Sequence, residues 1–441
     1  MERATSQGRS NEGAARGPSA LRYPYLRDAC KDFLVDALEL LKRRPVPSRE
    51  AAREEMEGII YGWTVAYRQR LMALPSAAHA ASAVEKSQLD IGKVTDKDGK
   101  ELASEEYAPG HVFDIVLAPL VAEYVAANRG RASYNARLYG TLYAHLEEAY
   151  SVGPLFRFVA ALENFEAERP RVRLETDLWI ERLTRADMQY LTLYFPQVGQ
   201  VFTEFGAPRP QWGIVTVHRS HRFAPFSGHM AKFRTLLLAL RLTRPEPVGY
   251  RFVVDYPARH ALRAAALGGA SSSMRPALFQ GPKYVLTRTD ENRARSIFRD
   301  LSDGAVLSEY PVAFSRFDDA YWRAKPEDAL IDVWIALESL FMPDADPREA
   351  TFRLALRIAY FLGRTSQERL DIDKDIRDSY KLRSDVVHGR SDNQPNLKAL
   401  ANKTAGYLRQ ALQAVVNQGA KLDVNKIDRA VRAGKNPRKI E

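Results

Sequence analysis

Apolar residues in the C-terminal third of the chain recur at helical spacing in four successive segments. The first begins at Pro326, a residue type favoured in the first turn of a helix, and the two acidic residues after it suit a helix N-terminus. Gly363 ends the second segment, a third starts near Ser366, and a long helix is expected over about 396–417. Short connections between the four predict a compact helical bundle.

The N-terminal part mixes helical and extended patterns. Residues 21–74 and 112–165 show helical spacing, the second stretch with interruptions near Gly130 and Gly153. Between them, an Asp-Lys-Asp-Gly turn signal inside residues 91–102 indicates a small hairpin.

Strand signals concentrate between residues 171 and 260. Segments 213–218 and 250–254 are rich in β-branched and aromatic residues, which predicts two strands. The apolar run 233–242 fits either a buried strand or a short helix, since periodicity does not separate the two for a run of this length. The predicted fold class is therefore α+β and predominantly helical.

These patterns divide the chain into four parts. A finer division of the long mixed region at about residue 165, into a helical and a mixed portion, is open. The predicted parts are a disordered tail at 1–20, a mixed α/β region at 21–310 (21–165 helical and 166–310 mixed in the finer division), a four-helix bundle at 311–418 and a basic tail at 419–441.

Composition narrows the class of protein. The 441 residues include 65 Lys and Arg against 55 Asp and Glu, a formal net charge of +10 that suits either RNA binding or general solubility. Cys30 is the single cysteine, so neither an intrachain disulfide nor a cysteine-rich zinc site is expected. No apolar run reaches the roughly 18 residues of a membrane helix, and the first twenty residues lack the apolar stretch of a secretory signal. We expect a cytoplasmic protein.

The segment with the most distinctive chemistry is Arg383-Ser-Asp-Val-Val-His388-Gly, in which four residues separate an arginine from a histidine. Its surroundings add further polar and aromatic residues in a fixed order. That order is Ser315-Arg316-Phe317, Tyr321, Arg323, Glu327 and Asp328, then the Ile-Ala-Leu-Glu-Ser-Leu run at 335–340, then Arg353, Arg357 and Tyr380. The composite, over about 312–418, resembles the ApeA-like HEPN domains of prokaryotes.

The resemblance carries expectations about fold and function. Active HEPN domains are helical, metal-independent endoribonucleases that build their site across a two-fold dimer, so it implies a homodimer that binds and cleaves RNA without metal or cofactor. It also implies a role in prokaryotic antiviral defence or stress. The N-terminal region is then expected to sense a trigger or partner protein, or to select the substrate.

The residue types support that chemistry independently. RNA cleavage without metal requires a base for the 2′-hydroxyl, an acid for the leaving 5′-oxygen and a cation for the phosphate. His388 can serve as base or acid, and Arg383 can bind phosphate through two hydrogen bonds. Ser384 or Asp385, four and three residues before the histidine, is a candidate to orient the imidazole. The candidates for contact with substrate are Tyr380 and Arg390.

A non-catalytic interpretation of the same residues stays open. Arg383 is able to pair with a carboxylate of the bundle such as Glu338, and His388 to cap a helix C-terminus. On an ideal helix the two lie about 140° apart, although Gly389 indicates that the helix ends there. Ser384 stands where many active HEPN nucleases have Asn, Asp or His. The alternative function is an RNA-binding or assembly protein.

Two other basic segments are candidates for a metal site or for contact with RNA. His218, His221 and His229 lie within twelve residues, but strand alternation places the first two on opposite faces, which favours a basic surface loop over a metal site. Such a loop could also contact single-stranded RNA by charge and stacking. The tail after residue 418 has seven basic and three acidic residues and the spacing of one more amphipathic helix.

Overall fold

The computed structural model describes eleven stretches of the chain. They are residues 23–42, 62–87 (without 63 and 65), 109–152, 155–195, 210–219, 226–258, 269–272, 282–343, 350–388, 397–419 and 421–434. The hairpin predicted within 91–102 and the tail at 1–20 lie outside them, as do residues 43–61 of the stretch 21–74 with helical spacing. Within these stretches no helix is both long and apolar enough to cross a membrane.

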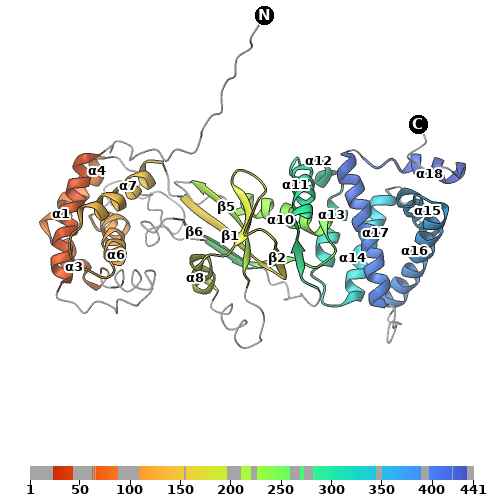
Figure 1. The fold of residues 1–441 in the computed structure, drawn as a ribbon, viewed down its shortest axis with the longest axis horizontal. Helices are drawn as coiled ribbons and strands as arrows, with labels where there is room; N and C mark the ends of the chain where they lie inside the picture. The colour runs from red at the N-terminus through yellow and green to blue at the C-terminus, as the bar shows by residue number, and fades with distance from the viewer. Residues whose placement is uncertain are drawn as a thin grey trace, which may run out of the picture. The chain divides into compact units, whose positions relative to one another are not determined.

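The chain separates into two compact units, and each is described by itself. The first contains residues 1–157, 218–224 and 256–268, and the second contains 158–217, 225–255 and 269–441. The secondary structure of the first unit is helical in its described residues apart from strand ends at 155–157, 218–219 and 256–257 (Figure 1). Its elements are α1 (Pro24–Leu41), α3 (Arg68–Met72), α4 (Pro75–Lys86), α5 (Pro109–Val112), the π-helix η2 (Phe113–Leu117), α6 (Ala118–Ala127) and α7 (Ala136–Val152).

Two buried tyrosines of α7 form hydrogen bonds to the backbone at the start of α1. On α7, the hydroxyl of Tyr139 donates to the carbonyl of Arg27 at 2.5 Å, and that of Tyr143 donates to the carbonyl of Tyr23 at 3.0 Å. Both rings are buried, so these bonds satisfy hydroxyls that burial would otherwise leave without water. The thiol of Cys30 lies in the same core, and burial raises its pKa to about 12.

The second unit contains a six-stranded sheet with the order β3-β4-β5-β1-β6-β7. Pairing is antiparallel between β3 and β4, between β4 and β5, and between β6 and β7. A separate parallel pair joins β2 to β8. The strands are β1 (Leu155–Glu163), β2 (Phe165–Ala167), β3 (Arg171–Arg173), β4 (Leu178–Arg182), β5 (Trp212–Arg219), β6 (Gly249–Pro257), β7 (Gly269–Ser272) and β8 (Tyr284–Leu286).

Strands β5 and β6 confirm the two predicted from residues 213–218 and 250–254. The helical prediction over 112–165 is wrong from Leu155 to Glu163, which form strand β1. Residues 158–162 are all buried, because β1 lies between β5 and β6 and is covered on both faces. Such a strand shows a continuous apolar run without alternation, and periodicity cannot distinguish it from a buried helix.

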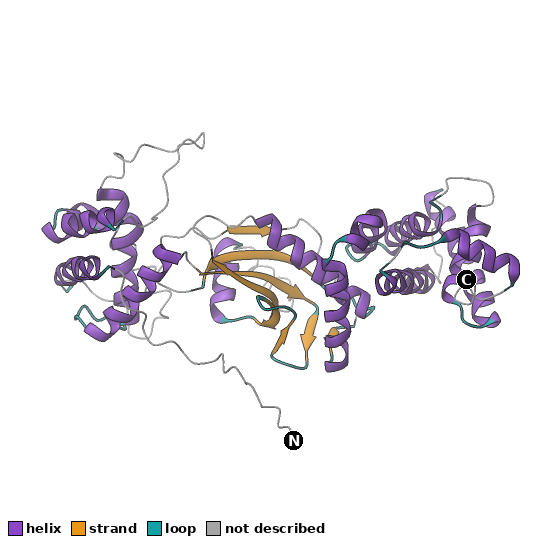
Figure 2. Cartoon of the chain, turned by 90° about the horizontal axis from the view of Figure 1, so that it is seen from above, coloured by secondary structure: helices purple, strands orange, loops and turns teal. Residues whose placement is uncertain are grey.

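The run 233–242 belongs to helix α10 (Phe226–Thr243). Its 18 residues exceed the length of a typical strand, and Phe233 packs against Phe158 of β1 with ring centroids 5.2 Å apart. Seen from above, the strands cluster in one region while helices make up most of the remaining described residues (Figure 2). The described part of the protein is therefore predominantly helical, with a mainly antiparallel six-stranded sheet and a separate parallel pair of strands.

Eight helices follow the sheet. They are α11 (Arg288–Ser302), α12 (Ala305–Glu309), α13 (Pro311–Ala320), α14 (Pro326–Phe341), α15 (Ala350–Leu362), α16 (Ser366–Val387), α17 (Leu397–Gln418) and α18 (Val424–Ala433). The predicted helix start at Pro326 and the predicted stop before Gly363 are confirmed. Each of α14, α15, α16 and α17 contacts the other three, and Figure 1 shows them running alongside one another.

Buried arginines fix the helices of this unit in place. Arg241 of α10 is fully buried, donates to the carbonyl of Val248 at 2.9 Å and forms an ion pair with Asp318 of α13. Arg357 of α15 is also buried and holds Asp428 of α18 through two hydrogen bonds of 2.9 and 2.8 Å. Paired in this way, the guanidinium groups keep the desolvation cost of their burial low.

Candidate functional site

The predicted site residues lie at the C-terminal end of α16. Tyr380, Arg383, Ser384 and Asp385 belong to the helix, which ends at Val387. His388 follows as the C-cap residue with φ −92° and ψ 11°, and its backbone N–H donates to the carbonyl of Ser384 at 3.1 Å. The helix start is set by a capping box of Thr365 and Glu368. Arg390 lies outside the described residues.

Arg383 and His388 occupy different sides of this helix end. The step of five positions from Arg383 to His388 corresponds to a rotation of about 140° and a rise of about 7.5 Å on an ideal helix. Burial agrees with that geometry, because Arg383 is half-buried whereas His388 is exposed. The backbone of His388 lies near the bridge region and not at helical values, so the regular helix ends before this residue. Ser384 and Asp385, between them, are half-buried.

The guanidinium of Arg383 lacks a protein partner for one of its donors. Its Nε is shielded from solvent and has no hydrogen-bond acceptor in the described part of the chain. Glu338, the carboxylate expected to pair with it in a purely structural role, forms no ion pair with it there. A buried N–H without an acceptor costs about 1–3 kcal/mol. Other buried donors, such as Trp179 Nε1 and Trp212 Nε1, share this state in the described residues, so the lack of a carboxylate partner is the more specific feature of Arg383.

A buried polar chain supports α16 one turn before Arg383. Trp334 Nε1 on α14 donates to Ser379 Oγ at 2.9 Å, and Thr404 Oγ1 on α17 lies 2.9 Å from the same hydroxyl. Thr404 Oγ1 also donates to the carbonyl of Leu400 at 2.8 Å, so one arrangement of the hydroxyl protons satisfies every group in the chain. Tyr380 packs edge-on against Trp334, with ring centroids 5.3 Å apart. These contacts hold the end of α16 in a fixed position.

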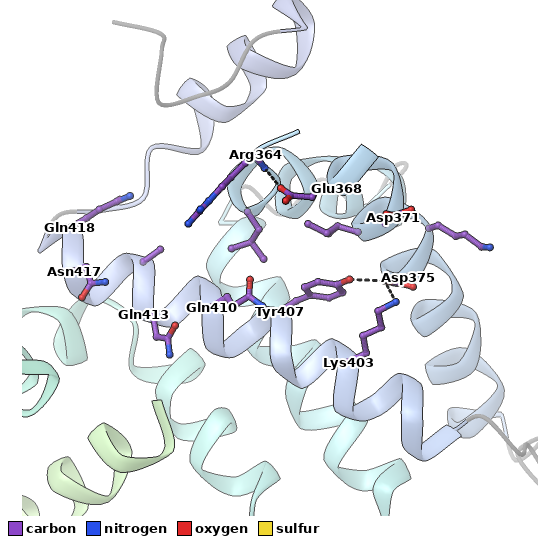
Figure 3. A pocket seen from close by; sticks show the side chains of 14 residues that line it. Arg364, Glu368, Asp371, Asp375, Lys403, Tyr407, Gln410, Gln413, Asn417 and Gln418 are labelled. Carbon is purple, nitrogen blue, oxygen red and sulfur yellow. Dashed lines mark hydrogen bonds and ion pairs between the residues drawn. The ribbon is translucent and has the colours of Figure 1, made fainter. Parts of the chain in front are cut away.

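The same group of helices contains a pocket of about 1000 Å³ that excludes both Arg383 and His388. It lies between the first half of α16, the turn that precedes it, and the second half of α17 (Figure 3). This pocket was not predicted from the sequence. The sequence feature that indicates it is a set of carboxamides on successive turns of α17, namely Gln410, Gln413, Asn417 and Gln418.

The histidines of the mixed region do not form a cluster of metal ligands in the described stretches. The ring of His218 stacks on Phe156 at 5.5 Å, and the ring of His229 packs on Phe158 at 5.0 Å. Desolvation lowers the pKa of His229, and nearby Lys232 lowers it further. His221 lies outside the described residues.

Comparison with protein-family models, curated proteins and solved structures finds no match for this chain. A functional conclusion therefore depends on the chemistry and geometry of the residues themselves. Two features of the C-terminal helices bear on it: the Arg383–His388 end of α16, and the pocket beside the first half of the same helix.

Proposed function

We propose that the protein is a metal-independent endoribonuclease of the HEPN type, which acts as a homodimer in prokaryotic antiviral defence or stress. The observation that supports this proposal most directly is the Nε of Arg383, buried without an acceptor at the end of a well-supported helix. An arginine that pairs with no carboxylate of the described bundle residues retains its charge and its hydrogen bonds for a ligand. Phosphate is the ligand that a planar guanidinium fits best.

In the proposed cleavage reaction, His388 transfers protons and Arg383 stabilises the negative charge on the phosphate. The imidazole accepts the proton of the 2′-hydroxyl, whose oxygen attacks the phosphorus, and a protonated imidazole donates to the departing 5′-oxygen. The products carry a 2′,3′-cyclic phosphate and a 5′-hydroxyl. Arg383 balances the negative charge that builds on the phosphate oxygens during the attack. Exposure of His388 gives the imidazole access to RNA.

A two-fold dimer resolves the separation of the two residues on α16. Because about 140° of helix rotation divides them, one subunit alone does not present both to one phosphate. Two antiparallel copies of the helix end, related by a two-fold axis, would set Arg383 of one subunit opposite His388 of the other. We infer that the scissile phosphate is held between such a pair, with Tyr380 and Arg390 available for further contacts to RNA.

One observation favours the alternative, in which the bundle binds RNA or a partner without cleaving it. On an ideal helix about 140° separates Arg383 from His388, and Ser384 does not carry the amide, carboxylate or imidazole common in active HEPN sites. The unpaired guanidinium would then serve binding alone. The two functions differ in whether the imidazole of His388 is required.

The test is cleavage of end-labelled RNA in the presence of EDTA by the wild type and by Arg383→Ala, His388→Ala and Arg377→Ala. Arg377 is the control, since it lies on the same helix and is exposed. It pairs with Asp373 one turn away, and its guanidinium lies over the ring of Phe352. We expect the wild type and Arg377→Ala to leave 2′,3′-cyclic phosphate ends, and the other two variants to lose at least about a hundredfold in rate. RNA binding by the wild type and by His388→Ala, with no cleavage by either, would establish the alternative.

A mixing experiment tests the shared site separately. Arg383→Ala and His388→Ala subunits, combined in equal amounts and allowed to exchange, form mixed dimers that keep one intact Arg383–His388 pair. Half of the dimers are mixed and each has one of two sites intact, so about a quarter of the wild-type rate should return. If the mixture stays inactive although the subunits exchange, the two residues act from the same subunit and the inferred dimer site is wrong.

A further inference from the structure

The pocket between α16 and α17 has a mixed but electrically balanced lining. Its acidic and basic side chains are equal in number, and the floor includes a few apolar residues such as Ile372. The charged lining consists of Glu368, Asp371 and Asp375 together with Arg364, Lys374 and Lys403. A volume of about 1000 Å³ lies at the upper end of the range for small-molecule sites.

The three carboxylates of the lining are already occupied by protein donors. Asp375 accepts from the hydroxyl of Tyr407 at 2.5 Å and pairs with Lys403 at 2.6 Å. Glu368 accepts the backbone N–H of Arg364 at 2.6 Å as part of the cap that begins α16. Asp371 accepts from the side chain of its neighbour one turn earlier on α16 at 3.0 Å. These acids are therefore poor candidates for binding a cationic ligand.

The side chain of Arg364 and most carboxamides of the lining are available to a ligand. The guanidinium of Arg364 forms no ion pair in the described stretches, and Figure 3 shows it extending from the turn before α16 over the second half of α17. Gln410, Asn417 and Gln418 are exposed and carry carboxamides that both donate and accept. Gln413, between them, is anchored by a hydrogen bond to the carbonyl of Leu242.

One permanent cation beside a row of carboxamides matches a small anion with a polar body. Guanidinium groups bind phosphate through paired hydrogen bonds. Carboxamides complement the alternating donors and acceptors of a nucleobase edge, much as Asn and Gln read adenine in nucleic acids. The balanced charge of the whole lining argues against a polyanion, because binding of an RNA strand depends on several phosphates being neutralised.

We propose that this pocket binds a mononucleotide, with its phosphate on Arg364 and its base against the carboxamides of α17. The site does not involve Arg383 or His388 and stands whether or not the protein cleaves RNA. The pocket lies against α16, whose opposite end carries those two residues. A nucleotide bound in this pocket would therefore connect α16 to α17, which also supports the end of α16 through Thr404.

The test is isothermal titration calorimetry of the full chain with AMP, GMP, CMP and UMP, followed by the matching nucleosides. We expect saturable binding of at least one mononucleotide, and a loss of at least about tenfold in affinity when the phosphate is absent. Arg364→Ala should cost a similar factor. Arg293→Ala, on α11, is the matched control because this arginine is also exposed and lies outside the pocket, and it should leave the affinity unchanged.

The other outcomes of these titrations either overturn or support a mononucleotide site in this pocket. Absence of saturable binding up to low-millimolar mononucleotide overturns it, as does an equal effect of Arg364→Ala and Arg293→Ala. Tighter binding of a short oligoribonucleotide, with the same dependence on Arg364, would assign the pocket to an RNA strand instead. A change in preference among the four bases in Gln410→Leu, with circular dichroism unchanged, supports base recognition by α17.

Discussion

Replacement of Arg383 by methionine separates a structural role for this arginine from a functional one. Methionine keeps the length and apolar character of the arginine stem and removes the guanidinium. If Arg383 held the bundle together, the substitution would destabilise the protein. If the guanidinium is kept for phosphate, the substitution should relieve an unfavourable burial and abolish RNA cleavage at the same time.

The structure sets the expected magnitude. A buried N–H without an acceptor costs about 1–3 kcal/mol, and the Nε of Arg383 is such a group. The rest of the guanidinium is part of a half-buried side chain, so its loss removes little favourable hydration. Since methionine fills most of the vacated space, the cavity cost is small. We expect Arg383→Met to increase the free energy of unfolding by about 1 kcal/mol.

Arg357→Met in the same bundle is the contrasting variant. Arg357 donates to Asp428 of α18 and to the carbonyl of Phe341, so its loss breaks a satisfied buried pair and should cost about 3 kcal/mol. Urea denaturation followed by circular dichroism measures both variants against the wild type. A loss of more than about 1 kcal/mol in Arg383→Met would refute the reasoning, because it would show that the guanidinium stabilises the fold.

Three further predictions concern the sheet and helix α10. Gly213→Ala should destabilise the protein by about 1–3 kcal/mol, since a Cβ there would lie 2.6 Å from Leu183 Cδ2 and 3.1 Å from the carbonyl oxygen of Ala160. Gly228→Ala in α10 meets no atom within 4 Å and should stabilise by about 0.5–1 kcal/mol in the same denaturation assay. Burial raises the pKa of Asp255 from 3.8 to about 7, so its contribution to stability is complete below about pH 4 and is lost as the pH rises through about 7. Asp255→Asn should remove a pH-dependent change on the order of 2–4 kcal/mol over that range, and unchanged pH dependence would contradict the assignment.

The C-terminal helices were predictable because local signals and packing agree there. Pro326 begins α14, Gly363 follows α15, and the Thr365 capping box begins α16 close to the expected residue. Each signal is contained within a few residues, so reading it does not require knowledge of the tertiary structure. The amphipathic spacing after residue 418 likewise becomes helix α18.

The sheet was only partly predictable, because its central strand depends on its neighbours. Strand β1 reads as helix from the sequence since both of its faces are buried, and that burial is created by β5, β6 and the helices that cover them. The segment 233–242 was ambiguous for the same reason. Its helical state follows from residues before Phe233 that extend the element to 18 residues.

The candidate site shows the same division between residue type and geometry. The spacing of Arg383 and His388 was sufficient to propose RNA cleavage as the chemistry, and helix geometry alone gave their expected separation of about 140°. The burial of the Arg383 Nε was not predictable, because it depends on packing between helices far apart in sequence. The pocket was missed because Arg364 and the α17 carboxamides are brought together only when the bundle forms.

Three arginines of the second unit are useful to compare, because they differ in what the fold provides for them. Arg241 and Arg357 are fully buried, and each has a carboxylate and a backbone carbonyl as acceptors. Arg383 is less buried, yet its Nε has no acceptor in the described residues. Nη2 of Arg241 also has no acceptor there, so one unsatisfied N–H is not what sets Arg383 apart. Arg383 differs because no carboxylate of the described residues pairs with it. A phosphate would supply both the missing acceptor and the missing negative charge, as the proposed function requires.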